Sequence, residues 1–390
     1  MIRPWRHPAI LVSGTLAACV FLSWLWQRAG PLDMEQTRLT LIPVAFADID
    51  GWERDDPGQA WAAFRRSCAR IAAAKEAHAL VRVCRAALAE SETMAGAAAR
   101  AFFERHFTPH RVAAPQAGFL TGYYEPEVQG SRTRDERYAV PLYGRPDDLI
   151  VRAPDAERAR YNNRVTGFRR AGGEELPYWT REEIEAGALE GRGLELVYLD
   201  DAAEAFLMQV QGSGTVVLPD GTRLRLGYAA KNGHPYTSIG RLLVERGEIA
   251  NDAMSLEALK AWLRADPERG ARLMRENRSF VFFRPLSEAE GREGPVGAHG
   301  VALAPGRSLA VDASYHALGL PVWVAAPTLD AHGATGFARL MIAQDVGSAI
   351  RGPERGDIFW GSGAEAGRIA GLTRAAGRFT VLLPKDAAGA

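Results

Sequence analysis

Two short apolar runs set among glycines near the C-terminus constrain the fold of this 390-residue chain more than any other feature. The runs, Leu340 to Ala343 and Ile358 to Trp360, predict short buried strands joined by glycine bends. Asp345 follows the first run and Asp357 precedes the second, so both carboxylates are expected at strand ends. Apolar neighbours raise the pKa of a carboxylic acid, which suits a general acid near neutral pH. Asp357 is therefore the predicted proton donor, although an aspartate before a glycine-rich turn is also typical of a turn or a helix cap.

The N-terminal residues 1–30 predict an export signal or a membrane anchor. A basic start precedes a nearly uninterrupted apolar run from Pro8 to Trp26, about the length that crosses a bilayer. Leu16 to Cys19 matches the lipobox of bacterial lipoproteins, which predicts lipidation of Cys19. The chain stays apolar beyond Cys19, which favours an uncleaved helical anchor instead. Both alternatives place the rest of the protein outside the inner membrane.

The charge balance argues against nucleic-acid binding. Lys plus Arg and Asp plus Glu each number 47, so the formal net charge is zero and no basic face is predicted. The chain has no HExxH or CxxC motif, and its glycines at 212 and 214 lack the context of a dinucleotide fingerprint. The sequence therefore predicts no metal and no cofactor.

Residues 31–55 are expected to be a linker, followed by helices in which apolar residues recur at helical spacing from Trp61 to Phe107. Cys68 and Cys84 lie in this region. In an exported chain such a pair predicts a disulfide, and two small buried thiols are the alternative. Nothing in these helices indicates catalytic chemistry.

The middle of the chain is expected to be rich in strands and to bind a ligand. Tyr123 and Tyr124 end a strand that starts at Gly118, and paired tyrosines can stack on sugar rings or simply lie half-buried. Strands are also predicted at 194–198 and at 205–210. Gln211 and Ser213 follow among glycines that allow a ligand close to the backbone, so they are predicted to bind substrate, with a polar bulge as the alternative.

Two short motifs predict local structure more specifically than the strand patterns do. Pro219, Asp220 and Gly221 between apolar residues predict a hairpin turn. Thr180, followed by two glutamates, predicts the cap of a short helix.

Several blocks in a fixed order carry a resemblance to a known family. They include GFLTGYYEPEV, MQVQGSG, GYAAKNGHPYTSIG, ENRSFVFF, VDASYHALGLPVWV, QDVGSAI and GDIFWGSG, which cover roughly residues 118 to 385. Together they resemble the membrane-bound lytic murein transglycosylase A family, with its C-terminal three-aspartate domain. The family's acids would map to Asp312, Asp345 and Asp357.

The resemblance implies an α+β fold that is mainly β. A double-psi β-barrel catalytic domain with N-terminal helices would comprise residues 56–128 and 281–390. An inserted β-rich, barrel-like, glycan-binding domain would comprise residues 129–280, with the glycan in the groove between the two domains, a usual place for an extended ligand.

The resemblance also implies the reaction, cleavage of the β-1,4 bond between N-acetylmuramic acid and N-acetylglucosamine in peptidoglycan without water. Asp357 would protonate the glycosidic oxygen and then, as a carboxylate, take a proton from the muramyl C6 hydroxyl, whose oxygen closes a 1,6-anhydro ring. Asp345 and Asp312 would support it. The enzyme would be an exolytic glycosidic-bond lyase, although the residues leave cleavage within a strand open.

Two other classes stay open at this point. A glycan hydrolase would use Asp345 and Asp357 as a pair of working carboxylates, and a non-catalytic wall-binding module would need neither. The expected partners are peptidoglycan and a membrane, with cell-wall synthesis or division proteins as further candidates. The expected location is the periplasmic side of a Gram-negative envelope, through an inner-membrane anchor or as a lipoprotein.

Overall fold

The computed structural model describes residues 39–73, 79–114, 117–152, 165–291, 293–331 and 334–385. The chain divides into two compact units, Met1–Leu39 and Thr40–Ala390, and the description below concerns the second. The predicted anchor over residues 1–30, with Cys19, lies outside the described residues. Within the described ranges, no helix has both the length and the apolar character needed to cross a membrane.

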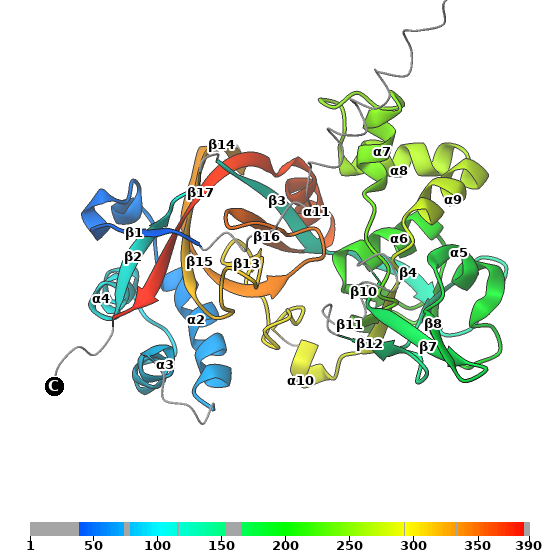
Figure 1. The fold of residues 1–390 in the computed structure, drawn as a ribbon, viewed down its shortest axis with the longest axis horizontal. Coiled ribbons are helices and arrows are strands. Elements are labelled where there is room, and N and C mark those ends of the chain that lie inside the picture. The colour runs from blue at the N-terminus through cyan, green and yellow to red at the C-terminus, as the bar shows by residue number, and fades with distance from the viewer. Residues whose placement is uncertain are drawn as a thin grey trace, which may run out of the picture. The chain divides into compact units, whose positions relative to one another are not determined.

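Six strands close into a barrel (Figure 1). They are β3 (Gly118–Glu125), β13 (Ser308–Val311), β14 (Pro321–Ala331), β15 (Ala334–Val346), β16 (Arg355–Ser362) and β17 (Arg374–Pro384). The order is β3-β16-β13-β15-β14-β17, and β17 pairs again with β3 to complete the ring. The pairs β13 with β15 and β16 with β3 are parallel, while the other neighbours are antiparallel. The strands predicted at 340–343 and 358–360 are confirmed within β15 and β16.

The barrel interior is filled by apolar side chains from strands far apart in the sequence. Leu120, Leu309 and Phe379 are fully buried, and all three converge on Gly356. A Cβ built on Gly356 would lie 2.7 Å from the Phe379 ring and 3.0 Å from each leucine. Alternation along β16 therefore points Gly356 into the barrel and Asp357 to its outer surface.

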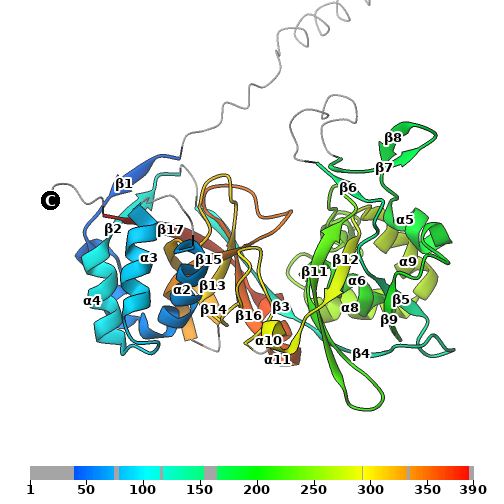
Figure 2. The ribbon, with the colours of Figure 1, turned by 90° about the horizontal axis from the view of Figure 1, so that it is seen from below.

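Three helices pack against one side of the barrel (Figure 2). They are α2 (Gly58–Ile71), α3 (Ala79–Ala89) and α4 (Gly96–His106). A disulfide joins Cys68 of α2 to Cys84 of α3. The fully buried Gln344 of β15 donates hydrogen bonds to the Ala63 carbonyl and to the Ser67 hydroxyl, each at 2.8 Å. This side-chain amide therefore fixes α2 against the barrel.

The rest of this side consists of short elements. They are β1 (Leu41–Pro43), β2 (Phe107–Val112) and the 3-10 turns η1 (Phe46–Asp48) and η2 (Trp52–Arg54). Strand β2 pairs with β17, and β1 pairs with β2. Residues 31–55 are predicted to be a linker, but β1 within them extends the barrel sheet through β2. Helix α11 (Gly363–Leu372) follows β16 and lies beside β3.

A second sheet of six strands, in the order β12-β11-β10-β4-β9-β5, stands apart from the barrel. Its strands are β4 (Glu127–Ser131), β5 (Val140–Tyr143), β9 (Glu195–Leu199), β10 (Gly214–Val217), β11 (Arg223–Lys231) and β12 (Val281–Pro285). A three-stranded sheet adds β6 (Ile150–Val151), β7 (Gly167–Ala171) and β8 (Glu174–Pro177). The pairing of β12 with β11 assigns residues 281–285 to the second sheet, whereas the sequence assigned them to the barrel. At the N-terminal boundary of the insert, β4 begins at Glu127, two residues before residue 129, where the insert was predicted to begin.

Helices surround the second sheet. They are α5 (Arg181–Glu183), η3 (Ile184–Ala188), α6 (Ala202–Gln211), α7 (Ile239–Glu245), α8 (Leu256–Ala265), α9 (Pro267–Glu276) and α10 (Glu288–Gly291). The cap predicted at Thr180 is confirmed, because its side chain accepts from the Glu183 N–H. The hairpin is also confirmed, since β10 and β11 pair across the turn and Gly221 has φ 82°.

The strand predicted at 205–210 is wrong, because these residues belong to helix α6. Asp201 caps this helix by accepting from the Ala203 and Glu204 N–H groups, and Gly212, with φ 80°, ends it. The helix lies between two apolar clusters, so that Met208 is buried in one and Phe206 in the other. A helix buried on both sides has no polar stripe, and a short apolar run of this kind cannot be distinguished from a strand by periodicity.

Candidate active site

Asp345 and Asp357 lie on the same face of the barrel, on either side of the small residue Ala310. Ala310 of β13 is the register partner of Asp345 on β15 and of Asp357 on β16. Residues directly opposite one another in a sheet share a face, and two strand spacings put the two aspartate backbones about 10 Å apart. The fold therefore brings together two acids that are 12 residues apart in the sequence.

Asp357 is half-buried, and its carboxylate has few partners. Its Oδ1 accepts a hydrogen bond of 2.5 Å from the Thr121 hydroxyl, and Thr121 Oγ1 in turn accepts one of 2.8 Å from Arg355. Burial raises the pKa of Asp357 to about 6, the charge of Asp345 adds to the rise, and Thr121 and Arg355 oppose it. A carboxylic acid with this pKa can both give and take a proton near neutral pH.

Asp345 is held by more donors. Its Oδ2 accepts from the Tyr123 hydroxyl at 2.9 Å, and its Oδ1 accepts from the Ala298 and Val346 N–H groups at 2.8 and 2.9 Å. Burial raises the pKa of Asp345 while these three hydrogen bonds lower it. Burial and the charge of Asp345 raise the pKa of Tyr123 well above its usual value, so Tyr123 remains a hydrogen-bond donor. Asp345 is the better stabilised anion of the two acids.

Asp312 lies just beyond β13, two residues after Ala310, and has a different environment. It accepts hydrogen bonds from the Ser314 N–H and hydroxyl and from the Gly352 N–H, at 3.1, 2.7 and 2.8 Å. Burial alone would raise the pKa of Asp312, yet these bonds and the charge of Arg351 bring it below its usual value. Asp312 therefore joins the turn after β13 to the loop before β16.

The other predicted binding residues divide between the two faces of β3. Tyr123 faces the acids and packs against Phe359, with ring centroids 5.3 Å apart. Tyr124 is buried on the opposite face, where a Cβ on Gly367 of α11 would lie 2.8 Å from its ring. Gln211, at the end of α6, accepts from the Tyr124 N–H at 3.1 Å, and the partly buried Ser213 follows between α6 and β10.

Four residues near the acids were not predicted from the sequence. Thr121 and Arg355 contact each other beside Asp357, and alternation on β3 places Thr121 on the same face as Tyr123, which is the one signal that could have revealed it. Lys231 donates from Nζ to the Ser348 hydroxyl at 2.8 Å, in the loop after Asp345. Burial raises the pKa of Tyr236 against a hydrogen bond with Ser238, and the charge of Asp357 adds to the rise. The influence of Asp357 on Tyr236 shows that the segment between β11 and α7 lies within electrostatic range of that acid.

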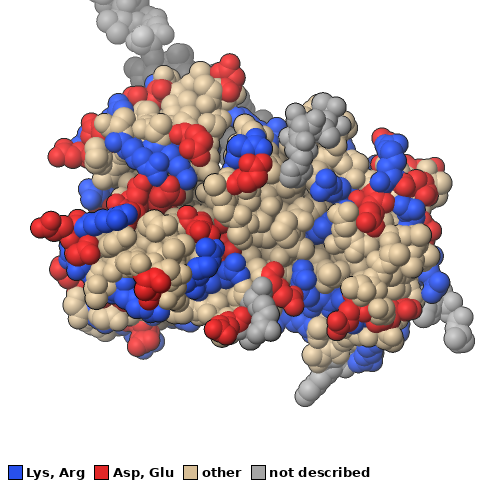
Figure 3. Space-filling view, turned by 180° about the vertical axis from the view of Figure 1, so that it is seen from behind, with Lys and Arg blue, Asp and Glu red and all other residues tan. Residues whose placement is uncertain are grey.

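The distribution of surface charges agrees with the equal numbers of basic and acidic residues in the sequence. On the face shown in Figure 3, positive and negative side chains are interspersed. Across the described residues, no three His, Cys, Asp or Glu side chains form a group that could hold a metal ion.

The fold and this centre define a class of protein, namely a closed-barrel protein with a pair of carboxylic acids of unequal pKa on the outer surface of the barrel. Comparison with known families is consistent with that class. The family described as "MltA specific insert domain" matches residues 119–284, and the family described as "3D domain" matches residues 307–383.

Individual relatives agree. Membrane-bound lytic murein transglycosylase A of Escherichia coli K12 is 37% identical over 275 residues, which are 69% of this chain and 67% of that protein. The Vibrio cholerae protein of the same name is 36% identical over 264 residues, covering 66% and 63%. The chain belongs to the membrane-bound lytic murein transglycosylase A family.

Solved structures give the same result. The crystal structure of a membrane-bound lytic murein transglycosylase from Agrobacterium tumefaciens is 36% identical, with a TM-score of 0.81, and the match covers 88% of this chain and 98% of that one. The crystal structure of E. coli MltA with bound chitohexaose is 29% identical, with a TM-score of 0.64, covering 89% and 95%.

Proposed function

We propose that this protein is a lytic transglycosylase of peptidoglycan that cleaves the β-1,4 bond between N-acetylmuramic acid and N-acetylglucosamine. The observation that carries this proposal is the half-buried Asp357, whose pKa of about 6 suits one group to act first as an acid and then as a base. The relatives are named for this activity, and one related structure holds chitohexaose, an oligosaccharide.

In the proposed reaction, protonated Asp357 gives its proton to the glycosidic oxygen as the bond from C1 breaks. The Asp357 carboxylate then removes the proton of the muramyl C6 hydroxyl, and O6 bonds to C1 to form the 1,6-anhydro ring. Asp357 is thereby returned to its starting state, and no water is consumed. The nucleophile belongs to the substrate, so its high effective concentration replaces a second catalytic base.

The residues around Asp357 have supporting roles. Thr121 orients the acid through its 2.5 Å hydrogen bond. Asp345, stabilised as an anion by three donors, is the electrostatic partner for positive charge that develops on the sugar ring. Asp312 supports the site by holding the loop at Gly352 in place.

We place the glycan against the face that carries these acids. Tyr123 is the proposed sugar contact, because it lies on that face beside Phe359. Gln211 and Ser213 complete the proposed binding set, whereas Tyr124, buried on the opposite face of β3, supports it by donating its backbone N–H to Gln211. Lys231 and Tyr236 extend the set from the β11–α7 region.

The domain roles follow the same proposal. The two parallel pairs in the six-stranded barrel support a double-psi topology for the catalytic domain, and the second sheet with its helices is the proposed glycan-binding insert. We further propose exolytic action on the periplasmic side of the envelope, through an N-terminal membrane anchor or lipidated Cys19, with cell-wall synthesis or division proteins as partners.

Hydrolysis by the two acids is the second candidate function, because Asp345 and Asp357 face the same surface on either side of Ala310. A retaining or inverting hydrolase needs two working carboxylates and leaves reducing ends. Replacing Asp345 by Asn separates the two candidates. A hydrolase loses all products, whereas a transglycosylase keeps the anhydro product at a lower rate.

The deciding experiment is mass spectrometry of purified glycan strands after digestion by the full-length chain and by its Asp357→Asn variant. We expect muropeptides lighter by one water with the wild-type chain and none with the variant. Reducing ends would contradict the lytic mechanism. Intact glycan that still binds the chain would contradict an enzymatic function altogether.

A further inference from the structure

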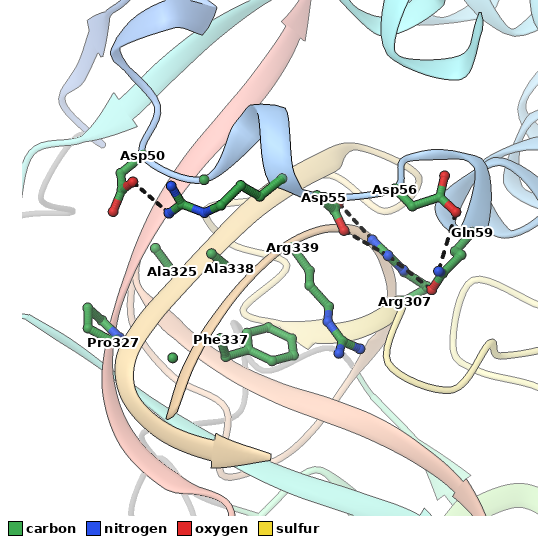
Figure 4. A pocket seen from close by; sticks show the side chains of 13 residues that line it. Asp50, Asp55, Asp56, Gln59, Arg307, Ala325, Pro327, Phe337, Ala338 and Arg339 are labelled. Carbon is green, nitrogen blue, oxygen red and sulfur yellow. Dashed lines mark hydrogen bonds and ion pairs between the residues drawn. The ribbon is translucent and has the colours of Figure 1, made fainter. Parts of the chain in front are cut away.

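A cavity lies on the barrel, where segment 50–59 crosses strands β14 and β15 (Figure 4). Its volume is about 520 Å³, within the range that accommodates a small ligand. Arg339, on the cavity wall, is six residues from Asp345 along β15, which corresponds to about 20 Å of strand. The cavity is therefore separate from the acid pair.

One wall of this cavity shows how the chain itself holds a carboxylate. The Arg307 guanidinium donates two hydrogen bonds of 2.8 Å to the two oxygens of Asp55 and one of 3.1 Å to Gln59. Both members of this ion pair are buried, with side chains 4% and 3% exposed. The charges of Arg307 and Asp55 therefore neutralise each other inside the wall.

Arg339 lines the same cavity and has no such partner among the described residues. In Figure 4 its side chain extends past Phe337 and has no drawn interaction, whereas dashed lines join Asp55 to Arg307 and Asp56 to Gln59. Asp50 is paired with Arg54. The Arg339 guanidinium lies over the Phe337 ring, 5.1 Å from the centroid. Arg339 is partly buried; burial and the charge of Arg307 lower its pKa, and the charge of Asp55 raises it. No hydrogen bond from its N–H donors is found among the described residues.

The held position of Arg339 favours a planar anion. A Cβ on Gly306 would lie 3.1 Å from a terminal nitrogen of Arg339, so the guanidinium lies between Gly306 and the Phe337 ring. Phe337 is itself buried and packs edge-on against Trp360, with ring centroids 5.8 Å apart. A guanidinium fixed in this way forms a fork that matches the two oxygens of a carboxylate and loses little entropy on binding.

The acids in the cavity restrict the ligand further. Asp50, Asp55 and Asp56 line it together with Arg54, Arg307 and Arg339. Asp50 is paired with Arg54 and Asp55 with Arg307, which leaves Asp56 and Arg339 without an ion-pair partner among the described residues. A carboxylate next to an amino group matches these two charges, because the carboxylate can meet Arg339 while the amino group faces Asp56. Amino-acid ends of this kind occur in the stem peptides of peptidoglycan.

We propose that this cavity binds the carboxylate end of a peptidoglycan stem peptide through Arg339, as a second contact away from the bond that is cleaved. This inference rests on the proposed function, since it takes peptidoglycan as the substrate. Such a site distinguishes glycan strands that carry stem peptides from strands that do not. Peptide-bearing strands gain an extra point of attachment, whereas strands without peptides are held by the active-site face alone.

The first test is direct binding. The tripeptide L-alanyl-γ-D-glutamyl-diaminopimelate is titrated into the full-length chain by calorimetry. We expect Arg339→Gln to weaken binding at least about tenfold, since it removes a charge-assisted pair of hydrogen bonds. Arg339→Lys keeps the charge but loses the fork, so its loss should be smaller. Arg246→Gln is the matched control, because Arg246 is exposed, paired with Glu276 and not part of the cavity lining, and we expect it to change affinity less than about twofold.

The second test compares peptidoglycan strands with and without stem peptides. Arg339→Gln should raise KM about fivefold for peptide-bearing strands, leave kcat unchanged, and alter neither parameter for peptide-free strands. An equal loss on both substrates, or tripeptide affinity that does not depend on Arg339, would overturn the proposal. Titration reports on the cavity even if no strand is cleaved, so failure of the proposed function remains distinguishable.

A third test uses the wild-type chain, so it does not depend on whether a variant folds. On titration with the tripeptide, the NMR signal of the Arg339 Nε–H group should shift. A signal that stays in place at tripeptide concentrations that saturate the chain would refute the site.

Discussion

Asp312 and Asp357 are carboxylates of the same barrel, close to the same strand pair, but their surroundings differ. Asp312 accepts three hydrogen bonds and has Arg351 3.6 Å away, and its pKa is held below the usual value. For Asp357, Thr121 is the one donor found among the described residues, and burial raises its pKa to about 6. Burial is the largest influence on both pKa values, and the three donors and the charge of Arg351 outweigh it at Asp312, whereas Thr121 and Arg355 do not outweigh it at Asp357.

Asp345 lies between these two cases. It has as many hydrogen bonds as Asp312, and two of the three donors are backbone N–H groups in both cases, but no cation is paired with Asp345 in the described part of the chain. Its pKa is raised by burial despite these bonds. The three acids therefore form a gradient, from a structural anion at Asp312 to a proton carrier at Asp357.

The largest expected effect is on kcat, and it compares Asp357 with Asp312, the two ends of this gradient. Asp357→Asn should lower kcat for anhydro-product formation at least about 10³-fold, because the proton carrier is lost. Asp312→Asn should lower kcat less than about tenfold at pH 7, since its carboxylate only holds a turn. The measurement is the rate of anhydro-muropeptide release by each variant. Equal losses in the two variants would show that the gradient does not separate catalysis from structure.

The second expected effect is on stability. Removing the Asp357 carboxyl should stabilise the folded protein, whereas most substitutions destabilise it. Asp357 has a folded-state pKa of about 6 against roughly 4 when unfolded. Its contribution to stability is fully present below about pH 4 and is lost as the pH rises through 6. Asp357→Asn should therefore be more stable than wild type by about 2 kcal/mol at pH 8, somewhat less than the full value for two pKa units because the residue keeps some access to water.

Urea unfolding of both proteins at pH 8 and pH 4 measures this difference. The gain should fall to a small fraction of its value at pH 4, where the wild-type carboxyl is protonated in the folded state and about half protonated in the unfolded state. A variant that is less stable than wild type at pH 8 would contradict the raised pKa and would identify Asp357 as a structural acid like Asp312.

Asp312 should show the opposite dependence on pH. Asp312→Ala removes the acceptor of the Ser314 and Gly352 N–H groups and should cost about 2 kcal/mol at pH 7. The folded-state pKa of Asp312 is lowered, so its contribution is present above the unfolded pKa of about 4 and is lost as the pH falls through the folded value. Urea unfolding at pH 7 and pH 2.5 should show the cost shrinking at the lower pH, and a constant cost would assign it to packing alone.

The sequence predicted those parts of the molecule that depend on local patterns or on whole motif blocks. The strands that carry Asp345 and Asp357 follow from short apolar runs between glycines, and the Pro219–Gly221 turn follows from its residue types. The buried helix 202–211 could not be distinguished from a strand, because apolar clusters cover it on both sides. The strand at 281–285 was assigned to the wrong sheet, since nothing within it specifies its partner.

The site was only partly predictable, for a related reason. Ala310 shows no chemistry of its own, yet its register sets the spacing of the two acids. Thr121 is 236 residues from Asp357 in the sequence, so only the parallel pairing of β3 with β16 brings it to Asp357, whereas Arg355 lies two residues from Asp357 on the same strand. The pKa of about 6 results from this arrangement, and apolar neighbours in the sequence indicated only its direction.

The smallest expected effect concerns Thr121, the one hydrogen-bond donor to Asp357 found among the described residues. Thr121→Val keeps the shape of the side chain and removes the hydroxyl, so the Asp357 anion loses its hydrogen bond. Because that bond favours the charged form, its loss should move the apparent pKa in the pH–rate profile up from about 6 by about one unit. Thr121→Ser retains the hydroxyl and is the matched control. A profile that does not move in Thr121→Val, with an unchanged thermal stability, would mean that burial alone sets the proton affinity of Asp357. The contrast with Asp312 would then depend on exposure to water, and the number of donors would have no part in it.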